Sequence, residues 1–431
     1  MEHVKCWSRR RFLSAAGMAG GLTAGAKKLV ASSAPESVRV FAFGESGKLS
    51  GLGASGDVYR ELGVTPVIDG QGTMTYLGGS LIPPEVEQVM ADAARHYVNI
   101  ADLEAAAGKR IAQMLKLPSG YTGLVTSGAA GAMTCGYAGI LTGRNEEFIK
   151  RVPDLTGMKS EVIIQKSHRY AFDHQIRATG VKLIEVETPD DVRKAAGPQT
   201  AAMHFTNFAN GAGRIKVDAW VKLAKECNLP CFNDAAADTP PVSHLWDYVN
   251  MGYDFVAFSG GKAIRGPQCA GLLLGREDLI QAALLNNSPF EDTVGRGQKI
   301  GKEEIVGMVK ALELFLNADH EAMTAEWWAR LDTVSRAVTR VSGVSTAYFV
   351  PDIANHIPTM QINWDPRKIS LTPRAALAAL KNSTPSIVLG GGRTGLEMNS
   401  FMLQPGEDQI IARSLVALFR AHPASQPADQ M

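Results

Sequence analysis

Short apolar runs alternate with helical stretches between residues 123 and 275, and this alternation restricts the fold more than any other feature of the sequence. Buried strands that alternate with helices predict a mostly parallel sheet with helices on both faces. In such sheets, ligands bind outside the carboxyl ends of the strands. The predicted strands are GLVTSG (123–128), SEVIIQKSH (160–168), VKLIEVET (181–188), TAAMHFTNF (200–208), LPCFNDAAA (229–237), YDFVAFSGG (253–261) and CAGLLLG (269–275).

The composition favours a globular protein that acts on a small molecule. The 431 residues are 45% hydrophobic and 20% charged, and 44 Lys and Arg balance 43 Asp and Glu. A nucleic-acid-binding protein usually carries a strong basic excess, so we expect no nucleic-acid partner. Cys227 and Cys231 are the only closely spaced cysteines, and no second pair or histidine completes a zinc set. We therefore expect no metal site.

The first residues predict an export signal rather than part of the fold. Ser8 is followed by paired arginines at positions 9 and 10, one further residue, and Phe12–Leu13, which is the twin-arginine pattern. The Ala/Gly-rich run that follows is too short to form a stable membrane span. We therefore predict a signal segment over 1–34, a periplasmic location and no membrane span in the mature form. The alternative is a disordered basic tail on a cytoplasmic protein.

The remainder of the chain divides into two predicted domains. A flexible arm (35–58) precedes a large domain (59–300), and a linker helix with a smaller α+β C-terminal domain (301–422) precedes a tail (423–431). The amphipathic pattern over 302–341 predicts one long linker helix. The predicted strands of the small domain are TMQINWD (359–365), SIVLGG (386–391) and GLEMNSFML (395–403).

Two strand ends carry a lysine and an aspartate that together indicate a cofactor. Lys262 follows Gly260 and Gly261 in FSGGKAIRGPQCAG, and Asp234 ends the strand of FNDAAAD. A buried lysine has a lowered pKa and can form a Schiff base, and a buried carboxylate can pair with a protonated pyridine nitrogen. This pair is the protein signature of pyridoxal 5'-phosphate. The alternatives are an exposed loop lysine and an aspartate that caps a helix, and Asp238 could serve as well as Asp234.

Other strand-end residues would complete the cofactor site. Ser127, Gly128 and Ala129 form a turn that runs into a helix, where free N–H groups and the helix dipole favour a phosphate. Ser259 lies three residues before Lys262, so its hydroxyl can face the same ligand. His168 could stack on the cofactor ring, and Asn207 could donate to the ring hydroxyl. Ordinary structural roles, namely a tight connection, a buried histidine and a strand-end turn, remain open for these residues.

Several segments resemble the fold-type-I pyridoxal-phosphate family of L-seryl-tRNA selenium transferase. They are GVTPVIDGQGTMTYLGGS (63–80), FNDAAADTPP (232–241), FSGGKAIRGPQCAGLLLG (258–275) and FMLQPGEDQI (401–410). The chain resembles more closely the D-glucosaminate-6-phosphate ammonia-lyase members of that family, from about residue 59 to 420. The block SGGK…GPQ…G is the most specific part of this resemblance.

The resemblance implies an aminotransferase-like large domain, a smaller C-terminal domain, and homodimers or larger homo-oligomers with shared active sites. It implies Lys262 as the Schiff-base lysine, Asp234 as the partner of the pyridinium nitrogen and His168 as the residue stacked on the ring. Ser127, Gly128, Ala129 and Ser259 would contact the phosphate, and Arg393 would bind a substrate carboxylate. Cys269 stands where the family commonly has a small hydroxyl residue.

We therefore expect a pyridoxal-phosphate-dependent lyase that acts on a small amino acid or amino-sugar acid by Cα deprotonation and β-elimination. Racemisation or aldol cleavage would use the same residues, so both reactions remain alternatives. A selenium-transferase-like activity on tRNA is a further alternative, against which the near-neutral charge argues. A non-catalytic exported binding protein with this fold is the alternative from a different functional class.

Overall fold

The computed structural model describes residues 56–391 and 394–424. The chain divides into two compact units, Met1–Glu61 and Leu62–Met431. Helix α2 (Val58–Glu61) is the described element of the first unit. The predicted signal segment, most of the predicted arm, and Arg393 lie outside the described residues. No helix in the described ranges is long and apolar enough to cross a membrane.

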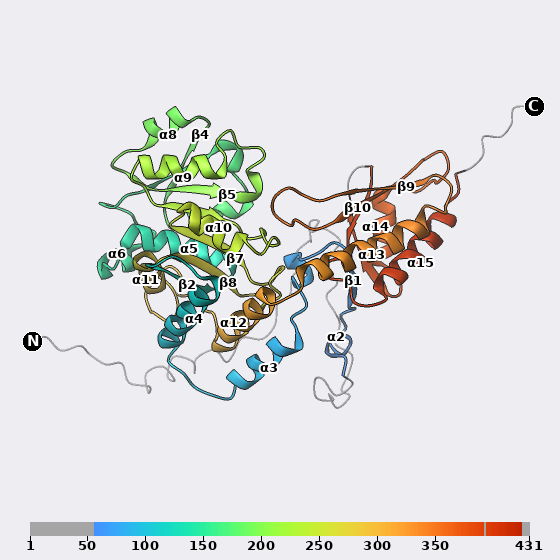
Figure 1. Ribbon diagram of the computed structural model, residues 1–431, viewed down its shortest axis with the longest axis horizontal. Helices are drawn as coiled ribbons and strands as arrows, with labels where there is room; N and C mark the ends of the chain where they lie inside the picture. The colour runs from blue at the N-terminus through green and yellow to red at the C-terminus, as the bar shows by residue number, and fades with distance from the viewer. Residues whose placement is uncertain (1–55, 392–393, 425–431) are drawn as a thin grey trace, which may run out of the picture. The chain divides into compact units, whose positions relative to one another are not determined.

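The larger unit contains a seven-stranded sheet in the order β2-β8-β7-β6-β5-β3-β4 (Figure 1). β3, β4, β5, β6 and β7 pair in parallel, and β8 lies antiparallel to both of its neighbours. The predicted mostly parallel sheet is therefore confirmed, and each of the seven apolar runs contributes a strand. The strands are β2 (Tyr121–Thr126), β3 (Glu161–Gln165), β4 (Lys182–Val186), β5 (Thr200–Thr206), β6 (Cys231–Asp234), β7 (Phe255–Ser259) and β8 (Gly271–Arg276).

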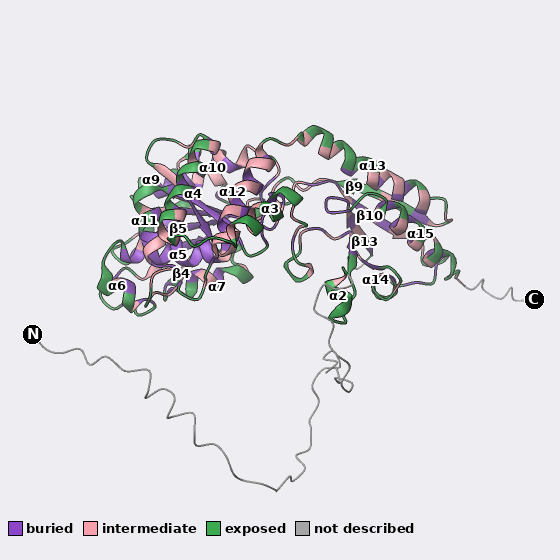
Figure 2. Cartoon of the chain, turned by 90° about the horizontal axis from the view of Figure 1, so that it is seen from below, coloured by how far each residue is buried: buried purple, intermediate pink, exposed green. Residues whose placement is uncertain are grey.

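Helices cover both faces of this sheet, because successive strand residues point to opposite sides. Leu124 belongs to a core with α5 and α11, whereas Val125 belongs to a second core with α4, α9, α10 and α12. Figure 2 shows the strands buried and the outer helix faces exposed. The helices are α3 (Pro84–Ala93), α4 (Ile100–Leu115), α5 (Gly128–Thr142), α6 (Glu146–Arg151), α7 (His174–Arg177), α8 (Pro189–Ala195), α9 (Val217–Glu226), α10 (His244–Met251), α11 (Glu277–Leu285) and α12 (Lys302–Leu316).

The C-terminal part contains a smaller antiparallel sheet in the order β12-β13-β10-β9. Its apolar side packs with helices in a third core. A separate short strand, β1 (Val67–Asp69), pairs in parallel with β11 (Ser386–Val388). The other elements are α13 (His320–Val338), β9 (Val344–Phe349), β10 (Thr359–Trp364), α14 (Pro373–Lys381), β12 (Gly390–Gly391), β13 (Gly395–Asn399) and α15 (Glu407–Arg420).

Two features of the C-terminal part differ from the prediction. The predicted single linker helix is two helices, because α12 ends at Leu316 and Asp319 caps α13 by accepting a hydrogen bond from the Ala322 N–H (2.9 Å). Ile68 packs in the core of the small sheet, although the predicted boundary at residue 59 assigns it to the large domain. The other domain boundaries stay a prediction.

Glu104 on α4 makes the stability of this fold depend on pH. Its carboxyl group is buried, accepts a hydrogen bond from the Val125 N–H (3.2 Å), and has its pKa raised by burial from 4.5 to about 8. Because the pKa of Glu104 is higher in the folded than in the unfolded protein, its protonated carboxyl group contributes fully to stability below about pH 4.5. This contribution is lost as the pH rises to about 8. We expect Glu104→Gln to stabilise the protein by about 3 kcal/mol more at pH 8 than at pH 5.

Urea unfolding of wild type and Glu104→Gln at both pH values checks this expectation. Glu187→Gln, a change at an exposed glutamate, serves as the matched control and should give no such difference. An equal gain for Glu104→Gln at pH 5 and pH 8 would contradict the assignment.

Candidate active site

Three chain segments meet at the carboxyl edge of the large sheet and surround a cavity. β6 ends at Asp234, β7 ends at Ser259, and α5 begins at Gly128 after β2. β6 and β7 pair in parallel, with Asp234 opposite Ala257, so both strands end at the same edge. The cavity has a volume of about 230 Å³, and the residues that line it include Gly128, Ala129, Phe172, Asp234, Ser259 and Lys262.

Two glycines allow the loop before Lys262 to pass close to the next segment. A Cβ atom on Gly260 would lie 2.8 Å from the Ala270 carbonyl oxygen, and one on Gly261 would lie 2.8 Å from the Gln268 Cα. The Gly260 N–H donates to that same Ala270 oxygen (2.9 Å). Side chains are therefore excluded at both positions, and Lys262 is the first residue after β7 that can project into the cavity.

The Lys262 side chain is half-buried and faces two cavities. Burial lowers its pKa from 10.5, and the negative charge of Asp234 opposes this effect. Its amine forms no hydrogen bond or ion pair with other described residues. A lysine with a lowered pKa has a larger neutral fraction at a given pH, and the neutral amine is the nucleophile. The local structure therefore prepares Lys262 to react with an electrophile.

Asp234 is a buried carboxyl group with two donors. The Tyr170 hydroxyl donates to its Oδ2 atom, and the Ala236 N–H donates to its Oδ1 atom (3.1 Å). Burial raises the pKa of Asp234, while these hydrogen bonds and the nearby charge of Lys262 lower it. Asp234 forms no ion pair at direct contact distance with the described residues, and a buried carboxylate without one is costly, so this position favours a ligand that brings a positive charge.

The start of α5 presents backbone N–H groups to the same cavity. Ser127 is the N-cap residue, yet its own side chain makes no capping hydrogen bond. Gly128, with a positive φ of 69°, and Ala129 line the cavity, and a Cβ atom on Gly271 would lie 2.5 Å from the Gly128 carbonyl carbon. The glycine at 271 therefore lets β8 approach this turn. An uncapped helix start of this kind suits an anionic group.

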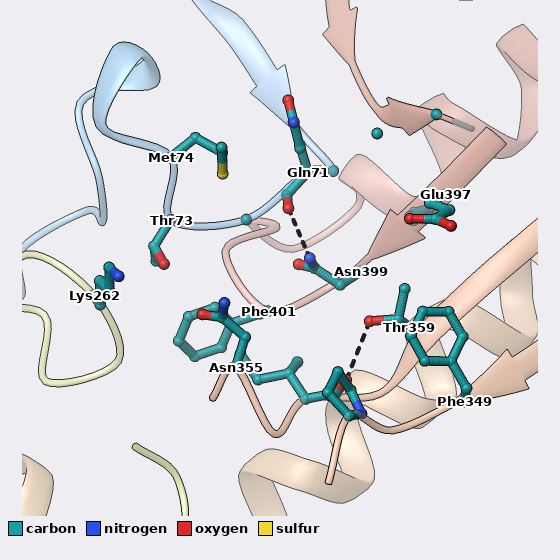
Figure 3. A pocket seen from close by; sticks show the side chains of 17 residues that line it. Gln71, Thr73, Met74, Lys262, Phe349, Asn355, Thr359, Glu397, Asn399 and Phe401 are labelled. Atoms are coloured by element: carbon teal, nitrogen blue, oxygen red, sulfur yellow. Dashed lines mark hydrogen bonds between the residues drawn. The ribbon is translucent and has the colours of Figure 1, made fainter. Parts of the chain in front are cut away.

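A second cavity, of about 440 Å³, shares Thr73 and Lys262 with the first (Figure 3). Its described lining combines neutral polar, apolar and glycine residues, with Lys262 as the basic and Glu397 as the acidic member. The Asn399 Nδ2 donates to the Gln71 carbonyl oxygen (2.8 Å), which joins β13 to the segment after β1. Besides Lys262, the polar side chains that line this cavity are Gln71, Thr73, Asn355, Thr359, Glu397 and Asn399.

His168 lies away from both cavities, which corrects the predicted ring-stacking role. Its side chain is fully buried between β3 and β5, where its ring packs edge-on against Phe205 (4.6 Å between centroids). Its ring nitrogens lie 3.1 Å from the Gln165 Nε2 and 3.2 Å from the Thr206 backbone nitrogen. Burial, with the charge of Lys216, lowers the pKa of His168 to about 4. The short 3-10 turn Lys166–His168 directs this side chain inward.

Asn207 is also absent from the lining of both cavities, contrary to the predicted contact with the ring hydroxyl. Its Nδ2 atom donates to the Asp238 carboxylate and to the Tyr248 hydroxyl oxygen (2.9 Å). Asp238, the alternative to Asp234, is fully buried in this network. The structure therefore brings Lys262, Asp234, Gly128, Ala129 and Ser259 together, with Ser127 adjacent at the helix cap.

Tyr170 and Phe172 are site residues that the sequence analysis missed. Tyr170 bonds to Asp234 and Phe172 lines the first cavity, and both follow His168 within two to four residues. The aromatic spacing in HRYAF (168–172) was the available signal. Arg393 lies outside the described residues, so its role stays a prediction. Cys269 is exposed, and the described ranges contain no cluster of three or more His, Cys, Asp or Glu side chains that could hold a metal.

Comparison with known proteins places the chain in a family. Residues 91–325 match the aminotransferase class-V family. D-glucosaminate-6-phosphate ammonia lyase of Salmonella typhimurium is 27% identical over 85% of this chain and 96% of its own length. The 5'-C-glycyluridine monooxygenase-decarboxylase of a Streptomyces species is 27% identical over 84% of this chain and 92% of its own length. L-seryl-tRNA(Sec) selenium transferase of Moorella thermoacetica is 24% identical over 83% of both chains.

The solved structure of a D-glucosaminate-6-phosphate ammonia-lyase matches the fold with a TM-score of 0.74 and 25% identity, over 85% of this chain and 99% of that one. The predicted resemblance and the aminotransferase-like fold are therefore confirmed. The family match covers more than half of the sequence and includes Asp234 and Lys262. The chain belongs to the aminotransferase class-V family.

Proposed function

We propose that this protein is a pyridoxal-phosphate-dependent lyase that removes ammonia from a small amino acid or amino-sugar acid. The family implies this cofactor. The observation that carries the proposal is the cavity that joins Lys262, whose pKa burial lowers, to Asp234, whose pKa burial raises. An amine whose pKa is lowered by burial and a buried carboxyl group that favours an adjacent cation are the two groups this cofactor requires.

The residues around the first cavity fit the cofactor. Lys262 would hold its aldehyde carbon, Asp234 its ring nitrogen, and the N–H groups at the start of α5 its phosphate, with Ser259 beside them. When bound, pyridoxal phosphate supplies an aromatic ring that accepts the electron pair left at the substrate Cα. Tyr170 and the Ala236 N–H orient the Asp234 carboxylate towards the cavity.

Lys262 would then take the Cα proton, because it lines both the cofactor cavity and the second cavity. Neutral amide and hydroxyl groups on the second cavity's walls suit a hydroxylated amino acid. Such a substrate loses its Cα proton and its Cβ hydroxyl group, which leave together as water. Hydrolysis of the resulting enamine releases ammonia and a 2-keto acid, so all atoms are accounted for.

A substrate panel tests this function on the purified protein loaded with pyridoxal phosphate. The panel contains D-glucosaminate, D-glucosaminate 6-phosphate, and the D and L forms of serine and threonine, with Lys262→Ala as the matched control. We expect equimolar ammonia and 2-keto acid from at least one compound. Inversion of configuration at the substrate Cα without ammonia release would favour a racemase, and release of an aldehyde would favour an aldolase. Silence across the panel would favour the non-catalytic binding protein.

We also propose that a second copy of the chain covers large apolar side chains of the segment before α4. Leu62, Tyr76 and Tyr97 expose 62%, 68% and 103% of their reference area, and Thr73 and Thr75 of the same segment line the first cavity. Such exposure of large apolar side chains is typical of an interface. Light scattering that gives a monomer at micromolar concentration would contradict a homodimer or larger assembly.

Export by the twin-arginine route is a separate proposal that the pattern at residues 8–13 supports. Fractionation of cells that express the full chain checks it. We expect the wild type in the periplasm and a variant with Arg9→Lys and Arg10→Lys in the cytoplasm. A wild-type protein found in the cytoplasm with Met1 retained would contradict export.

A further inference from the structure

Asp238 is a buried carboxylate that the proposed chemistry does not use. It follows Asp234 by four residues, and its side chain is fully buried. The Asn207 Nδ2 atom and the Tyr248 hydroxyl donate to its Oδ2 atom, which also lies 3.0 Å from the His244 Nδ1. These groups come from the large-sheet part of the chain, after β5 and on α10. One carboxylate oxygen is therefore held by three side chains.

The other oxygen of Asp238 holds the segment between β9 and β10. The Ala354 N–H donates to the Asp238 Oδ1 (2.9 Å), and the Asn355 N–H donates to the Ala237 carbonyl oxygen (2.6 Å). Two consecutive N–H groups of this segment are thus bound by two consecutive residues that follow β6. Hydrogen bonds to a buried charged group are among the stronger ones in proteins.

The backbone of Ala354 and Asn355 depends on these bonds. Both residues have positive φ values, 55° and 47°. The left-handed region is unfavourable for alanine, and it is rarely adopted by two non-glycine residues in succession. Local preference therefore opposes this conformation, and contacts with the rest of the fold must maintain it. The bonds to Asp238 and Ala237 are long-range contacts in a position to do so.

This segment forms one wall of the second cavity. Asn355 lines that cavity together with Lys262, and Figure 3 shows its side chain on the side of the cavity where Phe401 lies. Its side-chain amide makes no hydrogen bond with other described residues, so the amide is available to a ligand. Phe349, Pro351, Ile357 and Thr359, from the same stretch of chain, also line the cavity.

We propose that Asp238 is a positioning residue, whose buried carboxylate fixes the 351–357 segment so that the Asn355 amide faces Lys262 and binds a polar group of the substrate. The end of β6 and the residues after it would then serve both sides of the site, Asp234 towards the cofactor and Asp238 towards the substrate wall. The proposal rests on the proposed function in one point, which is that the second cavity receives the substrate.

Hydrogen exchange of the unloaded protein tests the link between Asp238 and this segment. We expect Asp238→Asn to speed exchange in a peptide covering residues 350–360 by about tenfold or more, because the Ala354 N–H loses a charged acceptor. Asp254→Asn is the matched control, since Asp254 accepts a hydrogen bond from the Cys231 N–H (2.9 Å) at the opposite end of β6. Unchanged exchange in Asp238→Asn, or an equal increase in Asp254→Asn, would overturn the proposal.

Tyr248→Phe decides the question if Asp238→Asn does not fold. This change removes one donor to the Asp238 Oδ2 and keeps the ring, so a smaller acceleration is expected in the same peptide. No acceleration in folded Tyr248→Phe would then count against Asp238 as the anchor of the segment.

A double-mutant cycle tests whether Asp238 acts through Asn355, with D-glucosaminate as the probe and KM and kcat measured separately. We expect Asp238→Asn and Asn355→Ala each to raise KM by about tenfold, and the double variant to show little further increase. If the increases in KM of the two single variants multiply in the double variant, Asp238 does not act through Asn355, and the proposal is overturned. Visible absorption on loading should be the same in all variants. A wild type without that absorption would contradict the proposed function, while the exchange result would still decide the role of Asp238.

Discussion

Replacing Lys262 with alanine should abolish the visible absorption that we expect when the wild-type protein is loaded with pyridoxal phosphate. Turnover of any panel substrate should fall by about 10³-fold or more, because the variant lacks both the covalent anchor and the base for the Cα proton. Lys262 is the one lysine or arginine among the described residues that line either cavity. The described lining therefore offers no second amine that could replace it. Absorption spectra and ammonia release measure the two effects.

Lys222→Ala is the matched control for this variant. Lys222 lies on α9, and its side chain is 75% exposed and pairs with Asp218 at the surface. Both the spectrum and the turnover of this control should equal those of the wild type. An unchanged absorption band in folded Lys262→Ala would remove Lys262 from the proposed role.

The rate at which the band appears should depend on pH in a direction that the structure sets. Burial lowers the pKa of Lys262 from 10.5, so the neutral amine forms at lower pH than in a free lysine. The rate should rise with pH and level off with a midpoint below 10.5, since only the neutral amine attacks an aldehyde. A midpoint at or above 10.5 would show that the amine is not desolvated.

Replacing Asp234 with asparagine should leave the absorption band in place and reduce turnover by about 10²-fold or more. The carboxamide can still accept from the Ala236 N–H and donate to the Tyr170 oxygen, so the fold of this edge should persist. A neutral amide cannot hold a proton on the ring nitrogen of the cofactor as a carboxylate can. Stabilisation of the charge that develops at Cα is therefore reduced, and kcat should carry most of the loss.

Asp254→Asn again provides the control, because Asp254 bonds to the same strand at its other end. Its turnover should be within about twofold of wild type, since it lies outside the lining of both cavities. Wild-type turnover in Asp234→Asn would show that this carboxylate does not support the reaction. Loss of the band in that variant would instead assign Asp234 to cofactor binding alone.

The fold could be predicted largely because its signals are local. The central strands of the large sheet are buried on both faces, so Val162, Ile163 and Ile164 of β3 appear as a continuous apolar stretch rather than as an alternating one. The predicted linker helix failed for a local reason too. The helical spacing of apolar residues is similar before and after residues 317–319, so it does not reveal the break. The break arises because the Asp319 side chain caps a new helix.

The candidate site could be predicted only in part, because side-chain direction after a strand depends on the turn that follows it. Asp234 ends a strand, so pairing with the neighbouring strand sets its direction. Lys262 lies in the loop after β7, where Gly260 and Gly261 let the chain pass close to the next segment. His168 and Asn207 also follow strands, but each lies in a 3-10 turn that directs its side chain into the protein. Tyr170 and Phe172 follow the turn Lys166–His168, and they reach the site in place of His168.

The amino-acid sequence alone was enough to predict the parallel sheet, the order in which its loops occur, and the pair Lys262 and Asp234. These features depend on residues that are close in the sequence, namely the apolar runs of the strands and the glycines of the tight loops. Only the tertiary structure decided which polar groups share a cavity. The bond from Ala354 to Asp238 joins residues 116 positions apart, and no pattern within either segment indicates the other. Long-range hydrogen bonds of this kind depend on how separate elements pack, and therefore appear only once the chain is folded.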